Sequence, residues 1–279
     1  MSIHRAALAC LLFATLRPAT AVDDARRARQ DRLEFMKARL AEFELQSDRN
    51  PPSPIVLADE PALRWTNPVR GVNGDGATFL WLRGGRPAAL ATVSIRTGGK
   101  VFREFALLDD EPLRASRKGR IVWSPRKNGL PFGPLEDAPA PAGSGALRLA
   151  QMRTLARRFR VDLLKGKPVE ARLLSRPLIR YAEPDAGVQD GAVFAFVEAT
   201  DPEVILILEA RRAEAHPDGR WLFSLARMTS PGVEVRLGDR VVWSAPPYWK
   251  NPRSPIDSYV EAYEGVYGET RSNAPGARK

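Results

Sequence analysis

A stretch that occurs twice constrains the fold of this 279-residue chain more than any other feature. Asp75–Leu82 reads DGATFLWL, and Asp190–Val197 reads DGAVFAFV. The flanks match as well: Arg64-Trp65 with Arg180-Tyr181, and RIVWS at 120–124 with RVVWS at 240–244. Equivalent residues lie 115 positions apart in the first block and 120 in the last. The pattern indicates an internal duplication, with a short insertion in the second copy.

The residues that the two copies share are those that build a scaffold. Asp-Gly and Pro are expected to set turns, and the aromatic and branched aliphatic residues are expected to fill sheets. Reactive polar groups are hardly shared, since Glu104 corresponds to Ser224 and Arg83 corresponds to Glu198. We therefore expect no symmetric active site between the two copies.

The patterning predicts an α+β fold that is mostly β, built from two duplicated antiparallel β-hairpin units that are sandwich- or barrel-like. An N-terminal amphipathic helix and one Arg-rich connecting helix complete it. Val204–Leu208 is apolar without alternation, which predicts a central strand covered on both faces. The expected segments are a signal peptide (1–21), an amphipathic helix (22–47), a Pro-rich linker (48–60), a first β unit (61–125), a Pro/Gly-rich loop with a basic helix (126–179), a second β unit (180–245), and an aromatic tail with a disordered end (246–279).

The N-terminus has the pattern of a secretory leader. Met1–Arg5 is short and basic, Ala6–Leu16 is mostly apolar, and Ala19–Ala21 is a small-residue cleavage site. We expect cleavage near Ala21 and an extracytoplasmic location, secreted or periplasmic. A cytosolic helix and an uncleaved anchor are the alternatives. Because Cys10 is the single cysteine, the mature chain would lack disulfides and thiolate metal sites, and no later segment resembles a membrane helix.

Positive charge is concentrated in one third of the chain. Leu113–Arg180 holds sixteen Lys and Arg against four acids, a net +12, while the whole chain carries +10. Such a region attracts polyanions, and an acidic envelope polysaccharide or an anionic lipid surface is the expected partner. Export argues against nucleic acid in vivo, and a merely solvated face is the alternative. The candidate binding residues are Arg114, Arg117, Lys118, Arg120, Arg153, Arg157 and Arg160, the last three forming one stripe on a helix predicted over Ala146–Val161.

The remaining chemistry is sparse. His216, the only histidine of the mature chain, lies in a turn sequence, and no nucleophile-elbow motif accompanies it. No catalytic residue, metal or cofactor is expected, and the sequence does not set the oligomeric state. The favoured function is a non-catalytic binding or cell-envelope-associated module with a basic face for anionic polymers. The alternative is a carboxylate-dependent hydrolase acting on polysaccharide, based on the acids Asp109–Glu111. A groove holding two acids from different elements would favour the hydrolase.

Overall fold

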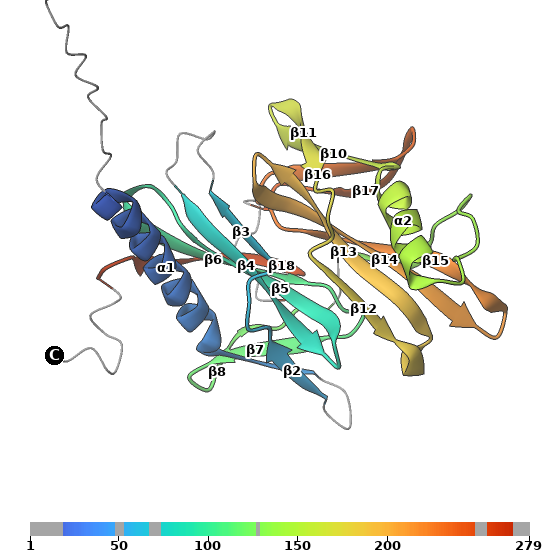
Figure 1. Ribbon diagram of the computed structural model, residues 1–279, viewed down its shortest axis with the longest axis horizontal. Coiled ribbons are helices and arrows are strands. Elements are labelled where there is room, and N and C mark those ends of the chain that lie inside the picture. Colours follow the sequence, from blue (N-terminus) through green and yellow to red (C-terminus); the bar gives the residue numbers. More distant parts are fainter. Residues whose placement is uncertain (1–18, 48–52, 67–73, 127–128, 249–255, 270–279) are drawn as a thin grey trace, which may run out of the picture.

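The described part of the chain folds into two antiparallel sheets of nine strands, each carrying one α-helix (Figure 1). The fold is mostly β, as the sequence predicts. The predicted leader lies mostly outside the described residues, and α1 begins within it, at Ala19. The computed structural model describes residues 19–47, 53–66, 74–126, 129–248 and 256–269.

The first unit comprises residues 19–123 and supplies eight strands of one sheet. The order across this sheet is β18-β6-β5-β4-β2-β1-β7-β8, with β3 paired to β4 at the side. Its elements are α1 (Ala19–Ala41), β1 (Phe43–Ser47), β2 (Pro54–Leu57), β3 (Leu63–Thr66), β4 (Asp75–Arg83), β5 (Arg86–Ile95), the 3-10 turn η2 (Thr97–Gly99), β6 (Lys100–Leu107), β7 (Leu113–Arg117) and β8 (Arg120–Trp123).

The second unit comprises residues 145–245 and supplies eight strands of the other sheet. The order is β17-β16-β10-β11-β13-β14-β15-β9, with β12 paired to β13 at the side. Its elements are α2 (Gly145–Ala156), β10 (Phe159–Lys165), β11 (Lys167–Leu173), β12 (Ile179–Glu183), the 3-10 turn η3 (Pro184–Ala186), β13 (Val188–Glu198), β14 (Asp201–Ala213), β15 (His216–Arg227), β16 (Gly232–Leu237) and β17 (Arg240–Ala245).

The duplication is larger than the sequence comparison indicates. Read backwards, the strand order of the second sheet matches that of the first position by position, and α2 precedes β10 as α1 precedes β1. The registers agree: Leu57 lies opposite Trp81 as Leu173 lies opposite Phe196. Every predicted hairpin is present, and Val204–Leu208 is the buried centre of β14, as predicted. The repeat therefore includes the helix and the two strands that follow it.

Each unit gives its last strand to the other sheet. β9 (Leu130–Pro134) follows β8 in the chain but pairs with β15 of the second unit. β18 (Tyr259–Val266) follows β17 but pairs with β6 of the first unit. The predicted aromatic tail thus contains a sheet strand, and Tyr259 is 1% exposed. This reciprocal exchange ties the two units together at one edge of each sheet.

Several predicted boundaries are wrong, and both helix boundaries fail for the same reason. The helix expected to run to Ser47 ends at Ala41, and the helix expected to run to Val161 ends at Ala156. Apolar residues continue at helical spacing to Phe43 and to Phe159, but these two are the first residues of strands β1 and β10, and burial alternates over the first three residues of each. The segments predicted as linker and loop also hold strands, namely β2 within 48–60 and β9 and β10 within 126–179, whereas β11 matches a strand expected over Val169–Leu174.

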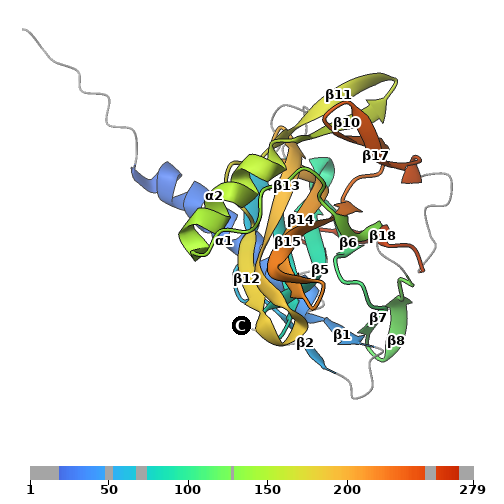
Figure 2. The same cartoon turned by 90° about the vertical axis from the view of Figure 1, so that its right-hand side faces the viewer.

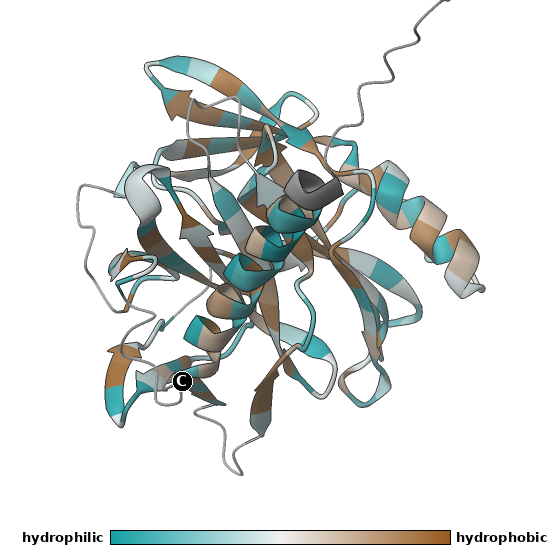
Figure 3. Cartoon of the chain, turned by 60° about the vertical axis from the view of Figure 1, so that its left-hand side comes forward, coloured by the Kyte–Doolittle hydropathy of each residue, from teal (hydrophilic) through white to brown (hydrophobic). Residues whose placement is uncertain are grey.

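The core has three parts, because most central strands are buried on both faces. One part lies between α1 and the first sheet, and a second lies between α2 and the second sheet. The third lies between the two units, where Leu80 and Leu90 share a cluster with Val193 and Ile207. Figure 3 shows α1 lying across the first unit with hydrophilic residues over much of its outer side.

The repeated Asp is part of an ionic staple rather than a turn. Asp75 accepts hydrogen bonds from Arg64, at 2.7 and 3.2 Å, and from Arg32 of α1, at 2.7 Å. The carboxylate thus ties α1 and β3 to β4, and it is nearly buried. The second unit repeats the arrangement with Asp190, Arg180 (2.8 and 2.6 Å) and Arg148 of α2 (2.9 Å).

The repeated Gly lies in a strand and makes room for an aromatic ring. A Cβ atom on Gly76 would lie 2.3 Å from the ring of Trp65, and one on Gly191 would lie 2.6 Å from the ring of Tyr181. Either contact is closer than van der Waals packing permits. The expectation that Asp-Gly forms a turn in both copies is therefore wrong, and the pair is conserved between the copies because it packs a helix and a ring against the sheet.

Candidate functional site

The two parts of the predicted basic region lie at opposite ends of the molecule. The hairpin β7–β8 belongs to the first unit, and α2 with β10 belongs to the second unit. Both views show them far apart (Figures 1 and 2). The seven candidate residues therefore form two separate groups rather than one face.

The hairpin group is only partly available to a ligand. Arg117 contacts Glu42 at 2.6 Å and Glu264 at 2.5 Å, so it ties the hairpin to the end of α1 and to β18. Its guanidinium also lies 5.1 Å from the ring of Phe43. Arg117 thus has a structural role, while Arg114, Lys118 and Arg120 are exposed.

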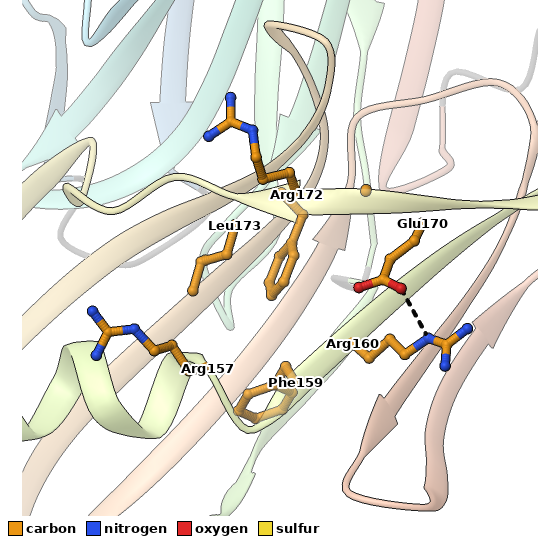
Figure 4. Close-up of a pocket in the computed structure, with 8 residues that line it drawn as sticks. Arg157, Phe159, Arg160, Glu170, Arg172 and Leu173 are labelled. Carbon is orange, nitrogen blue, oxygen red and sulfur yellow. Dashed lines mark ion pairs between the residues drawn. The ribbon is translucent and has the colours of Figure 1, made fainter.

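The helix group has a different geometry from the predicted stripe. Arg153 is half-buried on α2, Arg157 caps the C-terminus of α2, and Arg160 lies on β10. The prediction of a single helical stripe is therefore wrong, because α2 ends at Ala156, before Arg157 and Arg160. Arg157 and Arg160 nevertheless line the same groove, since they lie on the two sides of Phe159 (Figure 4).

The groove of the second unit lies where the end of α2 and β10 meet β11. Its volume is about 420 Å³, within the roughly 300–1,000 Å³ typical of small-ligand sites. Apolar side chains form its floor, and three of these four residues are no more than 5% exposed. The lining residues are the apolar Phe159, Ala171, Leu173 and Phe196 and the charged Arg157, Arg160, Glu170 and Arg172.

The charged residues of the groove differ in how far they are neutralised. Arg157 is exposed, and within the described residues its side chain makes no hydrogen bond or ion pair. Arg160 lies 3.2 Å from Asp162 and 3.5 Å from Glu170, whose side chain is 65% exposed. Arg172 donates to the backbone carbonyl of Ala199 at 3.3 Å, and its guanidinium points away from Phe159 (Figure 4). Arg157 and Arg160 are therefore the cations available to a ligand.

The first unit carries different residues at the equivalent positions. The floor residues Ala171 and Phe196 correspond to the larger Ile55 and Trp81, and Trp81 is 1% exposed. The charged residues Arg157, Arg160, Glu170 and Arg172 correspond to Ala41, Glu44, Pro54 and Val56. The cationic groove is thus a feature of the second unit that the shared scaffold does not require.

The acids behind the hydrolase alternative are neutralised by arginines. Asp109 is buried and lies 2.7 Å from Arg83, which also lies 3.3 Å from Glu111. Asp110 lies 3.6 Å from Arg211. Burial raises the pKa of Asp109, and Arg83 opposes that rise. The cluster is a structural ion network at the interface between the units.

A second buried network lies across the same interface and was not predicted. Glu209 is fully buried and accepts hydrogen bonds from Arg86 at 3.1 Å, from Tyr181 at 2.6 Å and from Arg211. Burial alone would lower the pKa of Arg86, but the negative groups around it, Glu209 first and then Tyr181, Asp109 and Asp110, together outweigh burial and raise that pKa. Arg86 comes from the first unit and Glu209 from the second, so this network holds the units together.

Glu104 lies in a third network, at the exchanged strand β18. It sits directly opposite Glu261 in the pairing of β6 with β18, and it accepts a hydrogen bond from Tyr259. Arg96 lies 3.9 Å from Glu104 and 2.8 Å from Glu261. Burial, and then the charge of Glu261, raise the pKa of Glu104 to about 8. A carboxyl group that stays protonated near neutral pH avoids repulsion between two buried charges.

Sequence reasoning missed the floor of the groove and Glu170. One signal was visible, because the aligned copies place Trp81 opposite Phe196, a change from a larger to a smaller ring. A second size difference, Ile55 in the first unit against Ala171 in the second, was not visible, because β2 and β11 lie outside the part of the repeat that the sequence shows. His216 is exposed and begins β15, directly after the hairpin turn at Glu214 and Ala215, so the prediction that it lies within a turn is wrong by one residue.

Comparison with known proteins identifies no relative. No protein-family model matches the chain, no curated protein matches its sequence, and no solved structure matches its fold. Within the described residues, no three or more His, Cys, Asp or Glu side chains group as a metal site would require. No helix in that part of the chain combines the length and the apolar composition needed to cross a membrane.

Proposed function

We propose that this chain is an exported, non-catalytic binding module that takes anionic ligands at the groove of the second unit. Export rests on the leader pattern of Met1–Ala21. The observation that carries the binding proposal is the pair of exposed cations, Arg157 and Arg160, on either side of an apolar floor. The expected partners in the envelope are an acidic polysaccharide or an anionic lipid surface.

The charge around the groove supports an anionic rather than a neutral ligand. Arg157 has no anionic partner among the described residues, and Arg160 pairs with Asp162 and with the exposed Glu170. An exposed arginine keeps its charge at every physiological pH and presents a planar set of donors to an acidic group. A ligand carboxylate or phosphate would therefore meet donors that the folded chain itself leaves largely unused.

The hydrolase alternative has less support. Glycoside hydrolysis uses two carboxyl groups on either side of the scissile bond. The groove is lined by one carboxylate, Glu170, which lies 3.5 Å from Arg160. Asp109 and Glu111 pair with Arg83 outside the groove. The arrangement therefore favours binding over bond cleavage.

Retention on immobilised polygalacturonate, a polymer of acidic sugars, tests this proposal. We expect the mature protein to be retained at low salt and released at high salt, because salt screens exposed charges. R157Q/R160Q should weaken binding about tenfold, since an exposed pair contributes roughly 0.2–1 kcal/mol per contact. The matched control is K118Q/R120Q, which removes the same charge from the exposed β7–β8 hairpin. Equal retention of both double variants and the native protein would contradict a site at the groove.

A further inference from the structure

We infer that the ligand of the second-unit groove is a small amphiphilic anion, a single acyl chain ending in one acidic group. This inference rests on the proposed function and narrows it. The chemistry of the lining residues separates such a ligand from a hydrophilic polymer that only touches the rim.

The floor of the groove has no hydrogen-bonding group for sugar hydroxyls, because the polar lining residues are three Arg and one Glu, all of them exposed. Among the eight lining residues none has an amide or hydroxyl side chain, and four are apolar. A sugar placed against Phe159, Phe196 and Leu173 would leave hydroxyl groups facing hydrocarbon, at a cost of about 1–3 kcal/mol for each one buried without a partner. An acyl chain would instead cover that surface and gain roughly 25 cal/mol for each Å² of apolar area removed from water.

The charges of the groove match one acidic headgroup. Arg157 and Arg160 flank Phe159, and Glu170 lies 3.5 Å from Arg160 (Figure 4). Arg172 is directed away from the floor, toward the carbonyl of Ala199. Arg160 is shared between Asp162 and Glu170, so Arg157 is left as the one positive charge at the mouth without an acidic partner among the described residues. A monoanion would neutralise it, with its acidic group between Arg157 and Arg160 and with Glu170 displaced into solvent.

Divergence between the two units has opened the space for the chain. In the first unit Ile55 and Trp81 occupy the positions of Ala171 and Phe196, and Trp81 packs edge-on against Phe105 with the ring centroids 5.1 Å apart. The reverse changes, A171I and F196W, would put the larger side chains of the first unit into the groove. The scaffold already accepts both residues at these backbone positions, so the filled groove should fold.

Calorimetric titration of the mature protein with monomeric decanoate, below its micelle concentration, tests the inference. We expect saturable binding of one decanoate per chain, about tenfold weaker binding of decanol, which lacks the charge, and no detectable binding of butyrate, which lacks the chain. A171I/F196W should lose decanoate binding and still be retained on polygalacturonate. E170Q should bind decanoate several-fold more tightly, because the competing carboxylate is removed.

The outcomes separate the inference from the proposed function. Decanol binding as tightly as decanoate, or decanoate binding unchanged in A171I/F196W, overturns the inference. So does an unchanged affinity in E170Q, which decides the matter if A171I/F196W fails to fold. Salt-sensitive retention on polygalacturonate that requires Arg157 and Arg160, without saturable decanoate binding, overturns the acyl ligand and leaves the proposed function standing. Retention on polygalacturonate that is unchanged in R157Q/R160Q contradicts the proposed function itself.

Discussion

The two units share a scaffold and differ in how they use their arginines. In the first unit, Arg103 and Arg117 lie over the ring of Phe43 and pair with Glu264. In the second unit, the equivalent positions hold Phe223 and Leu237, which are apolar and largely buried. Two cations of the second unit, Arg157 and Arg160, lie instead at its surface, beside the groove. The first unit thus uses two arginines for internal contacts at positions where the second unit is apolar.

What the two units keep in common shows which residues the fold needs. Both retain the staple of one Asp and two Arg, and both retain a Gly under an aromatic ring. Residues that differ between the units, such as Ala171 and Phe196 in the floor of the groove, are not required by the shared fold. Comparing two copies within one chain therefore separates structural residues from candidate functional ones.

The largest expected difference between the units concerns their repeated tryptophans. Trp123 is fully buried and donates a hydrogen bond to the carbonyl of Asp257 at 2.9 Å, whereas Trp243 is only partly buried. Trp123→Ala should lower the free energy of unfolding by about 3–5 kcal/mol, and Trp243→Ala should lower it by clearly less. Urea unfolding followed by circular dichroism measures both. Equal losses would show that the two hairpins are packed alike.

The ionic staple should be equivalent in the two units. Asp75→Ala and Asp190→Ala each leave two arginines without their carboxylate, one of them drawn from the helix. Because these hydrogen bonds involve charged groups at a nearly buried acid, each change should cost about 2–3 kcal/mol. Urea unfolding of the two variants under identical conditions gives the comparison. A loss confined to one unit would break the proposed equivalence.

The third expected difference is a pH dependence that only the first unit contributes. Glu104 has a pKa of about 8 in the folded chain, against an ordinary value of 4.5, and Ser224 takes its place in the second unit. Between these two pH values the folded state holds a proton that the unfolded state has lost, so stability falls as pH rises. Glu104→Gln should flatten that fall.

Urea midpoints at pH 5 and pH 8.5 measure the change in slope. Glu214→Gln, at an exposed position of the second unit, is the control and should leave the slope as it is in the native protein. An unchanged slope in Glu104→Gln would mean that the carboxyl group does not hold its proton in the folded state.

The sequence predicts local pairing well and long-range pairing poorly. Hairpins such as β4–β5 and β16–β17 were predictable, because alternating residues and a short turn lie within one stretch. The exchange of β9 and β18 was not predictable from local patterning. β9 contains one Gly and two Pro, and β18 contains two Glu and one Gly among its apolar residues. Which sheet edge such a strand joins depends on the other unit, and local patterning contains no information about it.

The candidate site was predictable in its charge but not in its shape. Arg157 and Arg160 stood out as part of a basic stretch, yet their helical spacing suggested the wrong surface. Their neighbourhood depends on β11 crossing beside β10, which places Ala171 opposite Val161. The small size of Ala171 matters only once that pairing is known, so a groove could not be inferred from the residues alone.

The claim that one unit of a duplicated pair has become the binding site is tested most directly by nuclear magnetic resonance. Backbone amide shifts of the mature protein, recorded during a titration with decanoate, report where the ligand sits. The account predicts saturating shifts concentrated at 157–173 and near Phe196, with the equivalent residues 41–57 and Trp81 unchanged. Shifts of equal size in both units, or shifts concentrated at the β7–β8 hairpin, would contradict it.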